Sequence, residues 1–291
     1  MSAFPPLTEV PTPGYWAHDL SPFLVRFPAG WPVDGIRWYG LAYVTGFLVA
    51  AWLLRVYFRK GRSPLNDDMQ ATLMTAGILG TVVGGRLGYV LGYMLVRDPG
   101  ALAKDPWVIF KVNQGGMSSH GGMIGIALAV AWCARRFKVS FLRLADIVVT
   151  LGPPGILFGR IANFINGELW GRETDVPWAV VFRFPDVREA VWLTPRHPSQ
   201  LYAAALEGAL LLLWTQWRFW KKEPLPEGQV AGECLIGYAL VRIVGEFWRE
   251  PDAGVSLVLG LSRGQFYSVF LAVAGVLVVW WARRAAAAKA A

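Results

Sequence analysis

Seven stretches of the chain, each about 20 residues long, are almost free of charged side chains. At a rise of about 1.5 Å per residue, some 20 helical residues cross the roughly 30 Å hydrocarbon layer of a bilayer. The pattern therefore predicts an all-α polytopic membrane protein with about seven transmembrane helices. The predicted spans are 36–58, 69–95, 117–134, 144–165, 198–217, 229–248 and 264–282.

The segments outside these spans predict the domain organisation. Residues 1–35 are rich in proline and aromatic residues and lack the basic start of a cleaved signal peptide, so we expect an exposed, partly ordered extracytoplasmic lead-in. Residues 36–285 form the transmembrane domain, and 286–291 a short cytoplasmic tail. The longest connection, 167–197, contains VPWAVVFRFP, whose β-branched and aromatic residues predict a short hairpin or small extracytoplasmic subdomain.

Composition supports the membrane assignment, and charge predicts an orientation. The chain of 291 residues is 55% hydrophobic and 16% charged, too apolar for an ordinary soluble domain. Translocated flanks disfavour Lys and Arg, so the basic clusters after the first, third, fifth and seventh spans are expected in the cytoplasm. These clusters are Arg55, Arg59, Lys60 and Arg62; Arg135, Arg136, Lys138 and Arg143; Arg218, Lys221 and Lys222; and Arg283, Arg284 and Lys289. The N-terminus is then outside and the C-terminus inside, and no motif indicates nucleic-acid binding.

Two cysteines, Cys133 and Cys234, lie within or at the edge of predicted spans, with no metal-ligand spacing around them. Buried free thiols are the favoured interpretation, rather than a disulfide or a metal site.

Three arginines remain inside the spans after the loops are accounted for: Arg86, Arg160 and Arg242. A charge at membrane depth is costly and normally faces a bundle interior or a cavity. Counted from the cytoplasmic boundaries at about 1.5 Å per residue, all three lie in the outer half of the bilayer. Other polar residues come to the same level: Tyr39, His120, Asn163, Asn166 and Glu168, together with Tyr238 and Glu246, which share a helical face with Arg242. Arginines with few carboxylates among them favour an anion, and the abundant anion at this depth is a phospholipid phosphate.

Structural alternatives remain open for several of these residues. Arg86 could extend to the interface or pair with a carboxylate, and Arg242 could pair with Glu246 at i, i+4. His120, flanked by glycines in GGMSSHGG, could be structural, and His197 in RHPSQLY could belong to an entry turn. The glycines that recur every fourth residue favour close helix packing; they are Gly80, Gly84, Gly88 and Gly92.

The run GRIANFINGELWG, residues 159–171, resembles the signature of the bacterial phosphatidylglycerol:prolipoprotein diacylglyceryl transferases. The segments RWYGLAYVTGF, GGRLGYVLGY, GGMSSHGGMIG, RHPSQLY and RIVGEFWREPD are similar to that family's segments in the same order, so the resemblance covers residues 35–285. One departure is Ala203, where the family often has Glu after the tyrosine of HPSQLY; Glu207 follows one turn later.

The resemblance implies transfer of the diacylglyceryl group of phosphatidylglycerol to the lipobox cysteine of a preprolipoprotein signal peptide, with a thioether formed and glycerol phosphate released. It implies a bacterial inner-membrane enzyme without a cofactor, with its active site toward the outer leaflet. Arg160 and Arg242 would be the critical basic residues, with Tyr39, Asn163 and Gly171 in the functional set. We further expect substrate contacts from Arg86, Asn166, Glu168, Tyr238 and Glu246.

His120 is a candidate base for the thiol, because imidazole titrates near neutral pH. Glu246, the phosphate or water are the alternative proton acceptors. A transporter or flippase, or a non-enzymatic lipid-binding scaffold, is the competing functional class. Transporters usually show internal repeats and a site near the midplane, whereas this chain shows no convincing repeat and its charges lie outward.

Overall fold

Helices occupy all seven apolar stretches in the computed structural model, which describes residues 14–28, 30–111, 116–183, 194–250 and 260–290. The first stretch contains α1 (Trp38–Arg59), and the second contains α2 (Asp67–Tyr89), which continues into η1 (Val90–Met94) and α3 (Leu95–Arg97). The third stretch contains α5 (Ser119–Phe137), and the fourth contains α6 (Phe141–Val149) followed by α7 (Gly152–Ile165). The last three contain α8 (Ser199–Ala203), η4 (Ala204–Leu210) and α9 (Leu211–Phe219) in succession, then α10 (Gln229–Gly245) and α11 (Arg263–Ala290).

Within the described residues, four helical stretches are long and apolar enough to cross a membrane. They are Trp38–Arg59, Asp67–Gly92, Phe141–Ile165 and Arg263–Lys289. The other predicted spans are helical but shorter or interrupted, since α10 has 17 residues and the fifth stretch contains a π-helical segment, η4. The chain is thus a helical, multi-pass membrane protein, and a count of seven spans stays a prediction.

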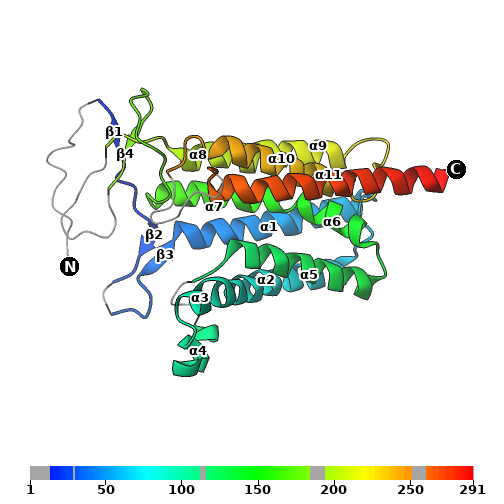
Figure 1. The fold of residues 1–291 in the computed structure, drawn as a ribbon, viewed down its shortest axis with the longest axis horizontal. Coiled ribbons are helices and arrows are strands. Elements are labelled where there is room, and N and C mark those ends of the chain that lie inside the picture. Colours follow the sequence, from blue (N-terminus) through cyan, green and yellow to red (C-terminus); the bar gives the residue numbers. More distant parts are fainter. Residues whose placement is uncertain (1–13, 29, 112–115, 184–193, 251–259, 291) are drawn as a thin grey trace. The chain divides into compact units, whose positions relative to one another are not determined.

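The chain divides into two compact units, one made of residues 1–50 and 149–291 and the other of residues 51–148. In the second unit α2 and α5 run side by side (Figure 1). Both helices begin at a capped N-terminus. The Asn66 side chain accepts a hydrogen bond from the backbone N–H of Met69 at 2.9 Å, and the Ser118 hydroxyl accepts one from Gly121 at 3.3 Å. Short helices α4 (Ala101–Lys104) and η2 (Pro106–Phe110) connect the pair.

Glycines allow α2 and α5 to approach each other closely. A methyl group at Gly84 would overlap the carbonyl oxygen of Gly121, and one at Gly80 would lie 2.5 Å from the carbonyl oxygen of Gly125. Gly88 likewise faces Gly121, whereas Gly92 has open space around it. The predicted glycine packing is therefore confirmed for the first three glycines of the repeat and is wrong for Gly92, which lies in η1 beyond the contact.

Gly84→Ala is expected to destabilise the protein by about 1–3 kcal/mol, because the added methyl group must push the two helix backbones apart. The measurement is thermal unfolding in one detergent. Gly92→Ala is the matched control and should leave the midpoint unchanged or raise it, since nothing lies within 4 Å of the new methyl group. Equal midpoints for Gly84→Ala and wild type would contradict this account of the helix pair.

In the first unit, residues before the first helix fold against the segment that follows α7. Strand β1 (Trp16–Ala17) pairs in parallel with β4 (Val180–Val181), and β2 (Phe23–Arg26) pairs antiparallel with β3 (Gly35–Arg37). The expectation of an exposed lead-in is therefore wrong for His18, which is only 5% exposed, whereas Trp16 is 47% exposed as expected. The VPWAVVFRFP segment does form a strand, which pairs with β1, and its Val180 also makes an antiparallel bridge to Arg196 within the same connection. Residues 184–193 and 1–13 lie outside the described residues.

The helices of the first unit also pack through small residues. A methyl group at Gly232 on α10 would lie 2.7 Å from the carbonyl oxygen of Gly275 on α11, and the converse distance is the same. A methyl group at Gly208 in η4 would lie 2.6 Å from Cα of Leu157 on α7. Close approach of α7, η4 and α10 brings their polar side chains together in a largely apolar unit. Both cysteines are free thiols, as the sequence indicates.

Candidate active site

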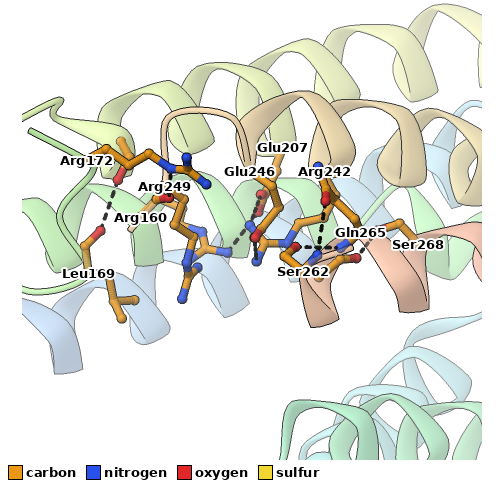
Figure 2. Close-up of polar contacts among 12 residues, drawn as sticks. Arg160, Leu169, Arg172, Glu207, Arg242, Glu246, Arg249, Ser262, Gln265 and Ser268 are labelled. Atoms are coloured by element: carbon orange, nitrogen blue, oxygen red, sulfur yellow. Dashed lines mark hydrogen bonds and ion pairs between the residues drawn. The ribbon is translucent and has the colours of Figure 1, made fainter. Parts of the chain in front are cut away.

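Arg160 on α7 and Arg242 on α10 bind the same carboxylate (Figure 2). Arg160 Nη2 donates to Oε2 of Glu207 at 2.9 Å, and Arg242 Nη1 donates to Oε1 at 3.2 Å. Glu207 is 1% exposed, whereas the side chains of the two arginines keep 20% and 16% of their surface accessible. The carboxylate thus holds two guanidinium groups from different helices in one accessible cluster.

Glu246 continues this chain of ion pairs. Its Oε1 lies 2.5 Å from Arg242 Nη2, so the i, i+4 pairing proposed as an alternative is confirmed. The start of α11 packs directly on the pair: a methyl group at Gly264 would lie 2.7 Å from Glu246 Oε1 and 3.1 Å from Arg242 Nη2. The formal charges of Arg160, Glu207, Arg242 and Glu246 therefore cancel, and the expectation of arginines with few carboxylates among them is wrong for this pair.

The π-helical segment η4 sets the direction of the Glu207 side chain. A π turn accommodates one more residue than an α turn and so rotates everything beyond it, and such turns occur frequently at functional sites. Ala203, where the family often has glutamate, ends α8 just before η4, and this stretch supplies a buried carboxylate from Glu207 instead. No role was predicted for Glu207 from the sequence. Its position within an apolar stretch could have marked it as a functional carboxylate.

The signature after Arg160 forms a tight turn at the end of α7. The amide nitrogens of Asn163 and Asn166 both donate to Glu168 Oε1, at 2.8 and 3.3 Å. Gly167 and Leu169 have φ angles of +68° and +59°, a left-handed backbone that is costly for leucine. Gln200 on α8 donates to the Glu168 carbonyl at 2.7 Å and fixes the turn. The structure therefore brings these three predicted residues together in one network.

His18 contacts the opposite side of the same turn. Its Nε2 lies 2.7 Å from the carbonyl oxygen of Phe164, and its ring packs against Phe164 and Phe182. A carbonyl only accepts hydrogen bonds, so the ring donates from Nε2. Burial lowers the pKa of His18, and the hydrogen bond to Phe164 opposes that shift. His18 was not among the predicted site residues, because its segment was expected to be exposed.

Gly171 is crowded by backbone from two other segments. Its N–H donates to the His197 carbonyl at 2.9 Å, and a methyl group on it would lie 2.5 Å from the Trp248 carbonyl oxygen and 2.6 Å from that of His197. His197 precedes α8, and its Nδ1 lies 3.2 Å from the Tyr202 hydroxyl, which agrees with an entry-turn role. Burial lowers the pKa of His197. Gly171 thus joins three segments of the site by close backbone contact.

Two tyrosines and a further arginine complete the surroundings of the cluster. Tyr238, one turn before Arg242, interacts electrostatically with Glu207, Arg160 and Arg249. Tyr39, near the start of α1, interacts with Arg160, and its ring packs at a tilt of 59° against that of Tyr43, with 5.3 Å between the ring centroids. Arg249, which the sequence analysis quoted in a segment but did not single out, is drawn beside Arg160 in Figure 2.

The model of the family described as prolipoprotein diacylglyceryl transferase matches residues 30–281. The chain belongs to this family. It is 43% identical over 263 residues to a protein of Photorhabdus laumondii, covering 85% of this chain and 88% of the relative, and 44% identical over 265 residues to one of Vibrio atlanticus, covering 91% of each. A Nitrosomonas europaea relative is 42% identical over 254 residues, 86% of each chain. All three are named phosphatidylglycerol–prolipoprotein diacylglyceryl transferase.

Two site residues predicted for this transferase-family chain belong to the second unit. Arg86 is 4% exposed, and its Nε, Nη1 and Nη2 donate to the carbonyl oxygens of Ile109, Gly116 and Val108 at 3.0, 2.9 and 2.5 Å. Its guanidinium therefore organises the connection between α2 and α5, and its contact with a substrate anion stays a prediction. His120 is exposed in the first turn of α5, and its role as base stays a prediction.

Proposed function

We propose that this protein transfers the diacylglyceryl group of phosphatidylglycerol to the cysteine thiol of a prolipoprotein lipobox. The observation that carries the proposal is the Arg160–Glu207–Arg242 cluster in a multi-pass member of this family. Two guanidinium groups held at one point can bind the oxygens of a single phosphate through paired donors. Phosphate is the group of phosphatidylglycerol that must leave.

In this reaction the thiol sulfur forms a bond to a glycerol carbon, while the bond from that carbon to the phosphate oxygen breaks. The products are a thioether and glycerol phosphate, and the thiol proton passes to an acceptor. Negative charge grows on the departing oxygen, so preorganised positive groups stabilise the transition state more than the ground state. Arg160 and Arg242 have this role in the proposal, and Tyr39, Tyr238 and Glu246 line their surroundings.

The Asn163–Glu168 network and Gly171 serve to position the arginine-bearing end of α7, because the Asn163 and Asn166 amide nitrogens and the Gly171 N–H are used within the turn and its neighbours. The bilayer holds both substrates, and no cofactor enters this reaction.

We further propose seven membrane spans, with the N-terminus outside and the C-terminus in the cytoplasm of a bacterial inner membrane. Residues 167–197 would then be extracytoplasmic, and the site would open toward the outer leaflet. The basic clusters support this orientation. Single cysteines placed at Thr174 and Lys221 and treated with an impermeant thiol reagent test it: position 174 should react from outside and position 221 should not.

The experiment for the function is the release of glycerol phosphate from phosphatidylglycerol by purified protein, with and without a lipobox peptide. A transferase releases it only with the peptide, and a peptide with serine in place of the cysteine should be inactive. Release without any peptide would indicate a phospholipase that hydrolyses phosphatidylglycerol to diacylglycerol and glycerol phosphate. If folded protein released no glycerol phosphate under any of these conditions, the transferase function would be excluded. A flippase or a lipid-binding scaffold would then be the remaining interpretation.

His120→Gln is expected to remove nearly all turnover at neutral pH, if the imidazole accepts the thiol proton, and to eliminate one limb of the pH–rate profile. The measurement is the rate of peptide modification over a pH series at saturating lipid. A variant that keeps substantial turnover and an unchanged profile would assign His120 to positioning and leave Glu246, the phosphate or water as acceptor.

A further inference from the structure

We infer that Glu207 makes the site select a singly charged phosphodiester over a doubly charged phosphomonoester, and that it thereby promotes product release. The inference rests on the proposed function, because phosphatidylglycerol is a phosphodiester and the glycerol phosphate produced is a phosphomonoester. A phosphodiester has one negative charge at any physiological pH. A phosphomonoester has one charge at low pH and gains a second with a pKa of about 6.

The position of Glu207 makes it suited to set this charge. It is 1% exposed, yet both of its oxygens bind the guanidinium groups that the proposal assigns to the phosphate. A phosphate held by Arg160 and Arg242 would therefore share them with the carboxylate. Coulomb repulsion from a fixed negative charge a few ångströms away increases with each charge on the ligand and is weakly screened in a buried setting.

The other charged groups around the cluster also affect how strongly it attracts a singly or a doubly charged phosphate. Arg160, Glu207, Arg242 and Glu246 cancel one another, and Arg249 adds one positive charge near Tyr238. The start of α11 contributes uncharged polar groups beside the charged Arg263: Ser262, just before the helix, and Gln265 bond each other at 3.1 Å, and Ser268 donates to the Gly264 carbonyl. The Glu207 carboxylate removes one positive charge from this group, and the resulting loss of attraction is greater for a dianion than for a phosphodiester.

The same charge arrangement favours release of the product. Cleavage of the carbon–oxygen bond leaves its electron pair on the phosphate oxygen, so the phosphomonoester is formed as a dianion, which gains a proton only below about pH 6. The product then has one more negative charge than the substrate that was bound. Glu207 repels this extra charge, so the dianionic product is held less strongly than Arg160 and Arg242 would hold it without the carboxylate.

The test compares two soluble inhibitors, glycerol phosphate and glycerophosphoglycerol, between pH 5 and pH 7. Glycerophosphoglycerol remains singly charged over this range, so the ratio of the two inhibition constants removes titration of the protein itself. For wild type, inhibition by glycerol phosphate should weaken relative to glycerophosphoglycerol as pH rises. In Glu207→Gln the trend should reverse, with glycerol phosphate at pH 7 inhibiting at least about 10-fold more strongly, relative to the diester, than in wild type.

Two further variants separate charge from structure. Glu207→Asp keeps the negative charge but shortens the side chain, so its rate should fall while the wild-type pH trend remains. Glu233→Gln is the matched control: Glu233 receives two bonds of 2.6 Å from Arg218 in another ion pair, and its loss should leave the inhibitor ratio unchanged.

An unchanged inhibitor ratio in folded Glu207→Gln would overturn the inference, as would wild-type inhibition by glycerol phosphate that strengthens with pH. The wild-type series decides the matter even if the glutamine variant fails to fold. Failure of the proposed function would appear as absent peptide modification by the wild-type protein. The inference could still be tested in that case, because the relative affinities of the two inhibitors can also be measured from the thermal stabilisation that they produce.

Discussion

Replacing Arg160 or Arg242 by lysine is expected to reduce turnover on the order of 100-fold, equivalent to roughly 3 kcal/mol of transition-state stabilisation. Lysine keeps the positive charge but presents a single ammonium instead of a planar fork of donors. Arg242 uses two of its nitrogens on two carboxylates, Glu207 and Glu246, and lysine cannot reproduce that arrangement. Because negative charge on the phosphate grows as the bond breaks, the loss should fall more on turnover than on lipid binding.

The measurement is the rate of peptide modification in matched nanodiscs, with folding checked by thermal unfolding. Arg218→Lys is the control, since Arg218 has an equally short pairing with Glu233 but no role in the proposed reaction. It should change the unfolding midpoint and leave turnover near wild type. Near-normal turnover in folded Arg160→Lys and Arg242→Lys would show that any positive charge suffices at these positions. It would contradict the proposal that the two guanidinium groups stabilise the leaving phosphate.

Gly171→Ala is expected to impair both stability and turnover. The added methyl group would lie 2.5 and 2.6 Å from two backbone carbonyl oxygens, at Trp248 and His197, neither of which can move without shifting its segment. Overpacking of this kind costs about 1–3 kcal/mol. Residue 248 lies next to Arg249 and residue 197 leads into α8, so the displacement reaches the segments around the arginine cluster. A misplacement of about 1 Å can cost on the order of 100-fold in rate.

Gly159→Ala is the matched control from the same signature. No atom outside its own helical turn lies within 4 Å of a methyl group at Gly159, which is immediately before Arg160. The control should fold and turn over as wild type does. If Gly171→Ala behaved in the same way, crowding would not explain the glycine, and direct contact between its backbone and substrate would become the better explanation.

The location of the helices could be predicted from the sequence because hydrophobic length alone decides where a chain can cross a bilayer. The depth argument also selected Arg160, Arg242, Tyr238 and Glu246, which the structure brings into one cluster. Spacing along a single helix was enough for the Arg242–Glu246 pair, since residues four apart share a face.

What the sequence could not supply was the contact between helices. Glu207 lies 47 residues from Arg160 and 35 from Arg242, and its direction depends on a π turn that no local pattern marked. The partners of Arg86 were missed for a related reason: they are backbone carbonyls, which every residue has and no sequence pattern distinguishes. His18 and β4 meet across more than 160 residues, and strands of two residues are too short to show an alternating pattern.

The most direct test of the proposed activity is the intact mass of a lipobox peptide after incubation with the purified protein and phosphatidylglycerol of defined acyl chains. The account predicts a mass increase equal to one diacylglyceryl group, located on the cysteine by fragmentation and absent from a serine peptide. A peptide that keeps its original mass, with protein shown to be folded in the same nanodiscs, would contradict the account.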